Sequence, residues 1–341
     1  MAASFRPRAR RADPLLGLIL VPLLAFLAAC GPSAVVPTAP PGATSSAAPP
    51  ATATPAIPTA TPAPTFPLAI TDDEGTTVAI PAAPQRIVSL TPAATETLFA
   101  LGVGSRVVAK AEDIAAYPPE ADDLPVVATF QGIDVEQIVD LEADLVIAGG
   151  GNPSFTPLAA IERLRGVGIP VVVLYARNID QALAGIRLVG LATGTSPDAG
   201  RLTAAMATEM AALGAATAVL EHAKVFYEID ATSKIYTVPA DSLYAEMLIL
   251  AGADPITTDD SYEISLEELV AADPAVILLG DDADYTTAAD VAARPGWGDI
   301  TAVKNGAVIP IADYVLVTRP GPRLVEGLRA LIEALHPEVL R

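Results

Sequence analysis

Two glutamates occupy the same place in two similar segments of this 341-residue chain. Glu136 and Glu267 each stand two residues after a residue that can cap a helix, Asp134 in one segment and Ser265 in the other. A carboxylate in the first turn of a helix is stabilised by the helix dipole by about 0.3–1 kcal/mol. An exposed carboxylate can also form a charge-assisted, often bidentate pair with an arginine of a partner protein. The positions alone leave both interpretations open.

A helix start offers a second kind of chemistry. The sequence Ser89-Leu-Thr91-Pro92 joins a predicted strand to a predicted helix, and proline suits the first helical position. The free backbone N–H groups of such a turn can receive a polar group of a ligand. In open α/β sheets, ligands bind at the carboxyl ends of strands, so we expect a ligand site there.

The sequence lacks the motifs of common enzymes and metal centres. It has no G-x-S-x-G elbow and no H-E-x-x-H helix, its glycine clusters lack dinucleotide-binding spacing, and its only thiol is Cys30. Its only histidines are His222 and His336, whereas a zinc or manganese site needs several converging ligands. We therefore predict a protein that is not an enzyme and that has no metal site and no cofactor.

The first 67 residues have the composition of a targeting signal followed by a tether. Residues 1–29 start with arginines and continue as an apolar run of about 15 residues, which is short for a transmembrane helix. Leu-Ala-Ala before Cys30 resembles a bacterial lipobox, so we predict a signal peptide over 1–29 and lipidation of Cys30. A plain signal peptide or a single N-terminal membrane anchor is the alternative. Residues 31–67 contain 11 prolines and no charge, which predicts that 30–67 is a disordered Pro/Ala/Thr tether.

The charge of the chain limits its partners. The net charge is −20, and it becomes −23 without residues 1–29, which hold four arginines and one aspartate. This excess of acid argues against nucleic acid and against anionic lipid surfaces as partners. It is compatible with docking onto basic loops of a membrane protein. We expect an extracytoplasmic protein held at the cell membrane by its lipid.

From Ile70 onward, β-rich runs alternate with helical patterns. The predicted strands are Arg86–Leu90, Arg106–Lys110, Leu145–Ala148, Val171–Leu174, Val225–Ile229, Ile235–Val238, Val276–Leu279 and Ala307–Ile311. Short, apolar, β-branched strands separated by helices favour parallel sheets that are covered on both faces.

An internal repeat divides the folded part into two related halves. Residues 136–149 align without a gap to residues 267–280, and residues 96–102 align more weakly to residues 246–252. The first pair predicts a short helix that begins with a capping box and leads into a buried strand. We predict an α/β fold of two Rossmann-like lobes, an N-terminal lobe over 68–176 and a C-terminal lobe over 215–341. A single long α-helix over 177–214 is expected to join them, with Gly194 and Pro197 as places where it could break.

Five stretches of the chain carry a family resemblance. They are RIVSLTPAATETLFALGVGSRVVA, YPPEADDLPVVATFQGIDVEQIVDLEADLVIAG, SLEELVAADPAVILLG, RPGWGDITAVKNGAVIPI and RPGPRLVEGLRALIEAL. Together they resemble the ABC-transporter solute-binding family for cobalamin, ferric siderophores and haem. The stretch over 117–149 is especially similar to the cobalamin-binding branch. The resemblance implies that Glu136 and Glu267, one on each lobe, dock onto arginines of an ABC permease dimer that works with ATPase subunits.

The resemblance also implies a ligand between the lobes. The candidate ligand-binding residues are Ser89, Thr91, Tyr117, Phe130 and Gly150 on the N-terminal lobe and Tyr227, Glu228, Tyr262 and Arg319 on the C-terminal lobe. The aromatic residues suit a flat macrocycle, although core packing is an equal alternative for each of them. We predict a monomeric importer component that binds a corrinoid (cobalamin). The alternatives are a protein that binds a ferric siderophore or other iron complex, and a ligand-sensing lipoprotein that serves no permease.

Overall fold

The computed structural model describes residues 64–150, 157–280, 285–311 and 313–341. The predicted signal peptide, Cys30 and the tether up to residue 63 lie outside the described residues. In the part that is described, no helix combines the length and the hydrophobicity that a membrane span requires.

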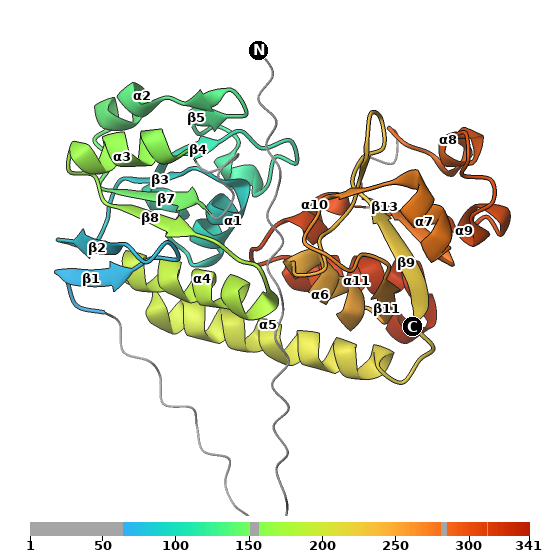
Figure 1. Cartoon of the computed structure of the whole chain (residues 1–341). Coiled ribbons are helices and arrows are strands. Elements are labelled where there is room, and N and C mark those ends of the chain that lie inside the picture. The colour runs from blue at the N-terminus through green and yellow to red at the C-terminus, as the bar shows by residue number, and fades with distance from the viewer. Residues whose placement is uncertain (1–63, 151–156, 281–284, 312) are drawn as a thin grey trace, which may run out of the picture. The chain divides into compact units, whose positions relative to one another are not determined.

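A six-stranded sheet forms the centre of the N-terminal lobe (Figure 1). Its strand order is β6-β5-β4-β3-β7-β8, and all neighbours are parallel except the antiparallel pair of β5 and β6. The strands are β3 (Ile87–Ser89), β4 (Val107–Ala111), β5 (Val126–Thr129), β6 (Gly132–Ile133), β7 (Leu145–Gly149) and β8 (Val171–Leu174). The lobe also contains the hairpin β1 (Leu68–Thr71) and β2 (Thr77–Ile80), and the helices α1 (Pro92–Ala100), α2 (Val135–Asp140) and α3 (Leu158–Gly166). The central strands β3 and β7 are buried on both faces, which explains their uninterrupted apolar sequences.

The C-terminal lobe is built on a smaller parallel sheet of order β11-β9-β13-β14. Its strands are β9 (Ala223–Glu228), β11 (Ala253–Pro255), β13 (Val276–Leu279) and β14 (Val308–Pro310), beside a separate antiparallel pair of β10 (Ile235–Tyr236) and β12 (Glu263–Ile264). Its helices are α6 (Leu243–Leu250), α7 (Leu266–Ala272), α8 (Ala288–Ala293), α9 (Thr301–Lys304), α10 (Tyr314–Thr318) and α11 (Leu324–Leu335).

The repeat in the sequence corresponds to a repeat in the fold. The order β4-β3-β7-β8 in one sheet matches β11-β9-β13-β14 in the other, and the N-terminal lobe adds β5 and β6 at one edge. Glu142 and Asp273, which align with each other, both adopt positive φ angles, of 51° and 46°. Positive φ is uncommon for residues other than glycine, so its recurrence at aligned positions marks the same helix-to-strand turn. The prediction of two α/β lobes is confirmed.

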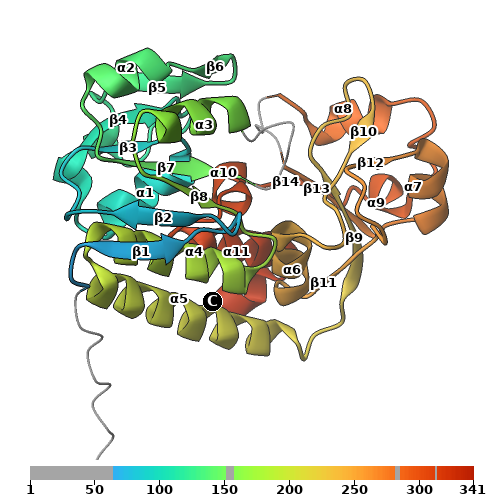
Figure 2. The ribbon, with the colours of Figure 1, turned by 60° about the vertical axis from the view of Figure 1, so that its left-hand side comes forward.

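The connecting segment differs from the single helix predicted over 177–214. It forms two helices, α4 (Ile179–Thr193) and α5 (Ser196–Thr217). Gly194 ends α4 in the left-handed conformation with φ of 86°, and Pro197 stands in the first turn of α5. The two helices pack so closely that a Cβ on Gly190 would lie 2.4 Å from the Cβ of Ala199. The helix α5 therefore returns the chain to the C-terminal lobe, where it packs against α6 and α11, while α4 also contacts α6 (Figure 2).

One hydrophobic cluster links the two sheets through these helices. It contains Ile87 of β3, Ile186 of α4, Met206 of α5, Val225 of β9 and Leu328 of α11. Two further clusters lie within the lobes, one under each sheet. Because these side chains form one core, α4 and α5 are packed against both lobes.

Candidate ligand-binding site

A cavity of about 770 Å³ lies between the N-terminal lobe, α4 and two short pieces of the C-terminal lobe. The strands β3, β4, β5, β7 and β8 all contribute their carboxyl ends or the residues directly after them. The C-terminal lobe contributes Tyr244 of α6 and the turn Thr318–Pro320. This is the place where parallel α/β sheets bind ligands, because loops diverge there and helix N-termini point toward the opening.

Three of the five N-terminal candidates line this cavity. Thr91 caps α1 and accepts a hydrogen bond from the backbone N–H of Ala94 at 3.2 Å. Phe130, at the start of the β5–β6 turn, is 94% exposed, an unusual state for so large an apolar side chain. Gly150 follows β7, and a Cβ there would lie 2.4 Å from Val173, so only glycine fits at this point of the wall.

The other two N-terminal candidates are not among the lining residues. Ser89 is completely buried, and its hydroxyl shares a 2.6 Å hydrogen bond with that of Thr95. Tyr117 lies outside the cavity, where its ring is covered by the guanidinium of Arg323 at 3.7 Å from the ring centroid. Both residues thus support neighbouring parts of the site.

Among the C-terminal candidates, Arg319 alone lines the cavity. Tyr227 is buried in the central strand β9, with its ring against Gly280. Glu228, at the end of the same strand, is also buried and accepts two hydrogen bonds from Arg294, at 2.6 and 2.8 Å. Tyr262 is about half exposed and outside the lining residues. The C-terminal wall is therefore smaller than the sequence suggested.

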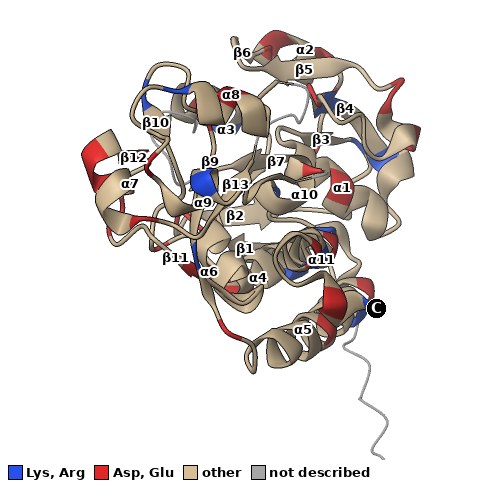
Figure 3. Cartoon of the chain, turned by 90° about the vertical axis from the view of Figure 1, so that its right-hand side faces the viewer, with Lys and Arg blue, Asp and Glu red and all other residues tan. Residues whose placement is uncertain are grey.

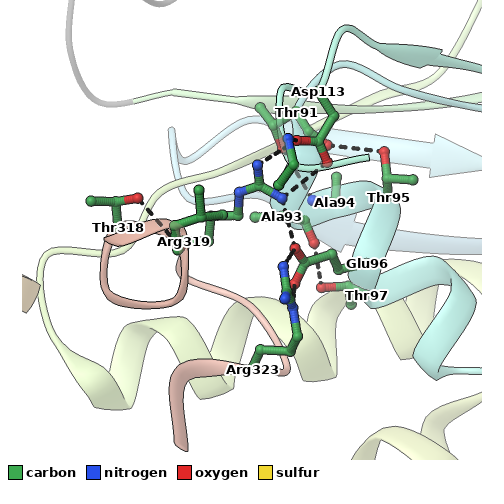
Figure 4. Close-up of polar contacts among 12 residues, drawn as sticks. Thr91, Ala93, Ala94, Thr95, Glu96, Thr97, Asp113, Thr318, Arg319 and Arg323 are labelled. Carbon is green, nitrogen blue, oxygen red and sulfur yellow. Dashed lines mark hydrogen bonds and ion pairs between the residues drawn. The ribbon is translucent and has the colours of Figure 1, made fainter. Parts of the chain in front are cut away.

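Arg319 reaches across to two carboxylates of the N-terminal lobe (Figure 4). Its Nη1 donates to Glu96 Oε1 at 2.8 Å and to Asp113 Oδ2 at 2.9 Å, and its Nη2 donates to Asp113 Oδ1. Arg323 also donates to Glu96, from Nη2 at 2.6 Å and from Nε at 3.2 Å. We call Glu96, Asp113, Arg319 and Arg323 the cross-lobe ion network. Two cations and two anions make it electrically neutral.

The network changes the acid–base properties of its members. Burial alone would raise the pKa of Asp113, but the hydrogen bonds and charge of Arg319 outweigh burial and hold that pKa below its ordinary value. Burial would likewise lower the pKa of Arg323, yet Glu96 raises it. Asp113 and Arg323 therefore remain ionised in the ordinary pH range.

Several lining residues escaped the sequence analysis. Tyr175 follows β8 directly, so the rule that ligands bind after strand ends would have found it. Burial, with Tyr262 and Tyr175 nearby, raises the pKa of Tyr244 to about 12, and its hydroxyl donates to the Thr318 carbonyl at 3.3 Å. Asp73 comes from the β1–β2 turn, where no sequence pattern predicted a site.

Asp73 differs from Asp113 in its electrostatics. Its Oδ2 accepts a hydrogen bond from the backbone N–H of Tyr175 at 2.7 Å. Burial raises the pKa of Asp73 more than this bond lowers it, and neighbouring Asp72 raises it further. The pKa values of Asp73 and Asp113 are thus shifted in opposite directions.

The aligned glutamates Glu136 and Glu267 are both exposed, in the first turns of α2 and α7. The helices lie in different lobes, on the side away from α5, and both carry acidic positions (Figures 1 and 3). Ser265 and Glu268 form the complete predicted capping box, with the Glu268 carboxylate held at the cap. Asp134 makes the first bond of such a box, by accepting from the N–H of Gln137 at 2.9 Å. Both glutamates therefore project from fixed helix starts.

Comparison with known proteins agrees with this architecture. Residues 87–315 match the family described as periplasmic binding protein. An ABC transporter substrate-binding lipoprotein of Bacillus subtilis is 32% identical over 80% of this chain and 87% of its own length. A vitamin B12-binding protein of Pectobacterium carotovorum is 32% identical over 60% of this chain and 74% of its own. The crystal structure of a periplasmic haem-binding protein of Roseiflexus superposes with a TM-score of 0.65 at 25% identity, covering 73% of this chain and 98% of that chain. The chain therefore belongs to the periplasmic binding protein family and has the substrate-binding role of an ABC transporter, not that of an enzyme.

Proposed function

We propose that this protein binds a corrinoid, cobalamin, in the cavity between its lobes and delivers it to an ABC permease. The observation that carries the proposal is the cavity itself. Its volume of about 770 Å³ lies in the upper part of the range of small-molecule pockets, which is roughly 300–1,000 Å³. Such a space suits a bulky ligand, and a relative with 32% identity is named for vitamin B12 binding.

The walls of the cavity favour a large, mostly uncharged ligand. Phe130 and Tyr175 present aromatic surface, and small or apolar residues such as Ala93, Ala128 and Ile186 form much of the rest. Aromatic side chains gain contact area against a flat macrocycle. Thr91 and Gln181 offer polar groups that could orient peripheral amides.

Binding of cyanocobalamin to residues 64–341, measured by isothermal titration, tests the ligand. We expect one site and a loss of affinity of about tenfold for Phe130→Ala, because the exposed ring loses its contact area with the ligand. Val219→Ala is the matched control, since Val219 is also an exposed apolar side chain but lies between α5 and β9. Absence of both heat and a thermal shift with cyanocobalamin would reject the corrinoid.

In that case a ferric siderophore or another iron complex becomes the candidate ligand. A haem-binding protein with the same fold shows that this architecture accommodates iron macrocycles. Titration with haem and with ferric hydroxamates would then identify the class.

Delivery requires docking, which we assign to Glu136 and Glu267. One carboxylate on each lobe, paired with permease arginines, would report the arrangement of the lobes to the permease through directional hydrogen bonds. A lipid on Cys30 and the proline-rich segment after it would keep the monomeric protein near that permease.

The double substitution Glu136→Ala/Glu267→Ala tests the docking role. We expect uptake to be abolished while cyanocobalamin affinity changes less than about twofold, because neither residue lines the cavity. Glu120→Ala/Glu221→Ala is the control, with the same charge change on one exposed acid of each lobe. Normal uptake by the double variant would reject the docking role of these two glutamates. Uptake that is equally normal without the protein would favour a ligand-sensing lipoprotein that serves no permease.

A further inference from the structure

An arginine in a ligand cavity ordinarily marks a receptor for anions, since its guanidinium matches carboxylate, phosphate and catecholate oxygens. Among the described residues that line this cavity, the charged ones are Asp73, Glu112 and Arg319. Arg319 is thus the one cation that such a ligand would meet on these walls.

Three of the five N–H donors of Arg319 are used within the protein, all of them by carboxylates. Both terminal nitrogens donate to Asp113, and Nη1 also donates to Glu96 at 2.8 Å (Figure 4). The backbone N–H of Ala115 donates to Asp113 at 2.9 Å and holds that carboxylate in place. Arg323 holds Glu96 from the other side.

An anionic ligand would have to compete with these carboxylates. The side chains of Glu96 and Asp113 are only 1% and 3% exposed, so water cannot replace the arginine if it turns away. Separating a buried ion pair leaves an uncompensated buried charge, which is strongly unfavourable. With Arg319 occupied, the charge that remains on the walls comes from Asp73 and Glu112.

We infer that Glu96 and Asp113 are specificity-determining residues, which occupy Arg319 and so make the cavity select neutral or cationic ligands over anionic ones. This inference rests on the proposed role of the cavity as the ligand site. It names the charge class of the ligand and does not depend on the corrinoid skeleton.

A charge series on one skeleton tests the inference with the unmodified protein. Cyanocobalamin is neutral, and hydrolysis of one or three peripheral amides gives anionic carboxylates of nearly the same shape. We expect the tricarboxylate to bind at least about tenfold more weakly than cyanocobalamin at low salt. Equal or tighter binding of the tricarboxylate would overturn the inference.

Asp113→Asn then removes one anionic partner of Arg319, while Glu96 still pairs with Arg319 and Arg323. We expect the affinity for the monocarboxylate, relative to cyanocobalamin, to rise about tenfold. The gain should vanish in Asp113→Asn/Arg319→Gln, which removes both partners together. Asp122→Asn, an exposed site with the same charge change, should have no effect. An unchanged ratio in Asp113→Asn, or a gain that persists without Arg319, would overturn the inference.

Failure of the corrinoid proposal can be distinguished from failure of the inference about ligand charge. If cyanocobalamin does not bind, the same comparison is made with a neutral ferric tris-hydroxamate and a trianionic ferric tris-catecholate. Preference for the neutral complex supports the inference about ligand charge for a ligand other than a corrinoid. Preference for the trianion, or binding of neither, overturns it.

Discussion

Glu96 and Glu246 stand at aligned positions in the two halves of the repeat, and both reach out of their own lobe. Glu96, in α1, accepts hydrogen bonds from Arg319 and Arg323 of the C-terminal lobe. Glu246, in α6, accepts a hydrogen bond at 2.7 Å from the backbone N–H of Ile179, the first residue of α4. The repeated sequence therefore places a carboxylate at the junction twice. The partner is a pair of charged side chains in one case and a helix N-terminus in the other.

The two glutamates therefore tie the lobes together through different kinds of contact, an ion pair at Glu96 and a helix cap at Glu246. The Glu96 tie depends on ionisation, because an amide would leave Arg323 without its anionic partner in a mostly buried place and Arg319 with Asp113 alone. The Glu246 tie requires only an acceptor, since a helix N-terminus supplies a partial positive charge and an unpaired N–H group. The ion network also borders the cavity, whereas the Glu246 tie supports the helix that forms its floor.

Alanine substitutions of Glu96 and Glu246 should give the largest difference in the free energy of unfolding. We expect Glu96→Ala to lower the free energy of unfolding by about 3 kcal/mol, because it leaves the mostly buried Arg323 without its anionic partner and removes one of the two partners of Arg319. Glu246→Ala should cost about 1 kcal/mol, comparable to the loss of a helix cap. Urea unfolding at neutral pH measures both values.

Glutamine provides the control for this comparison. Glu246→Gln keeps an oxygen acceptor and should recover most of the lost stability. Glu96→Gln keeps its shape but not its charge, and should remain destabilised. Similar behaviour of the two glutamine variants would contradict the distinction between an ionic tie and a capping tie.

Much of the fold could be predicted because parallel strands have distinctive sequences. Each of the eight predicted strands coincides with an observed one, and seven of them belong to the two mainly parallel sheets, where apolar, β-branched runs are buried. Some strands that escaped prediction are very short, as β6 and β12 with two residues each illustrate, whereas β5 has four residues and lies inside its sheet. The break at Gly194 was visible in the sequence, but the close packing at Gly190 that folds α4 back along α5 was not.

The site was harder to predict, because it depends on contacts between distant residues. Arg319 was recognised as a cavity residue, but its partners Glu96 and Asp113 lie 223 and 206 positions away in the sequence. Tyr227 and Glu228 were assigned to the site from the family resemblance, yet β9 is central in its sheet and both side chains are buried. Composition cannot tell a strand end that faces the cavity from one that faces a neighbouring helix or an arginine such as Arg294.

Asp73 and Asp113 extend the comparison to acid–base behaviour, with smaller expected effects. The pKa of Asp113 is lowered in the folded protein, so its stabilising contribution is complete above the ordinary value of 3.8 and is lost as the pH falls through the lowered value. The pKa of Asp73 is raised, so its contribution is complete below 3.8 and is lost as the pH rises through the raised value.

Asp113→Asn should therefore weaken the loss of stability on acidification below pH 4. Asp73→Asn should remove a loss of stability that the wild-type protein shows as the pH rises above 4, while its amide oxygen still accepts from Tyr175. Urea unfolding from pH 3 to pH 7 measures both slopes, and slope changes of the same sign in the two variants would contradict the opposite shifts.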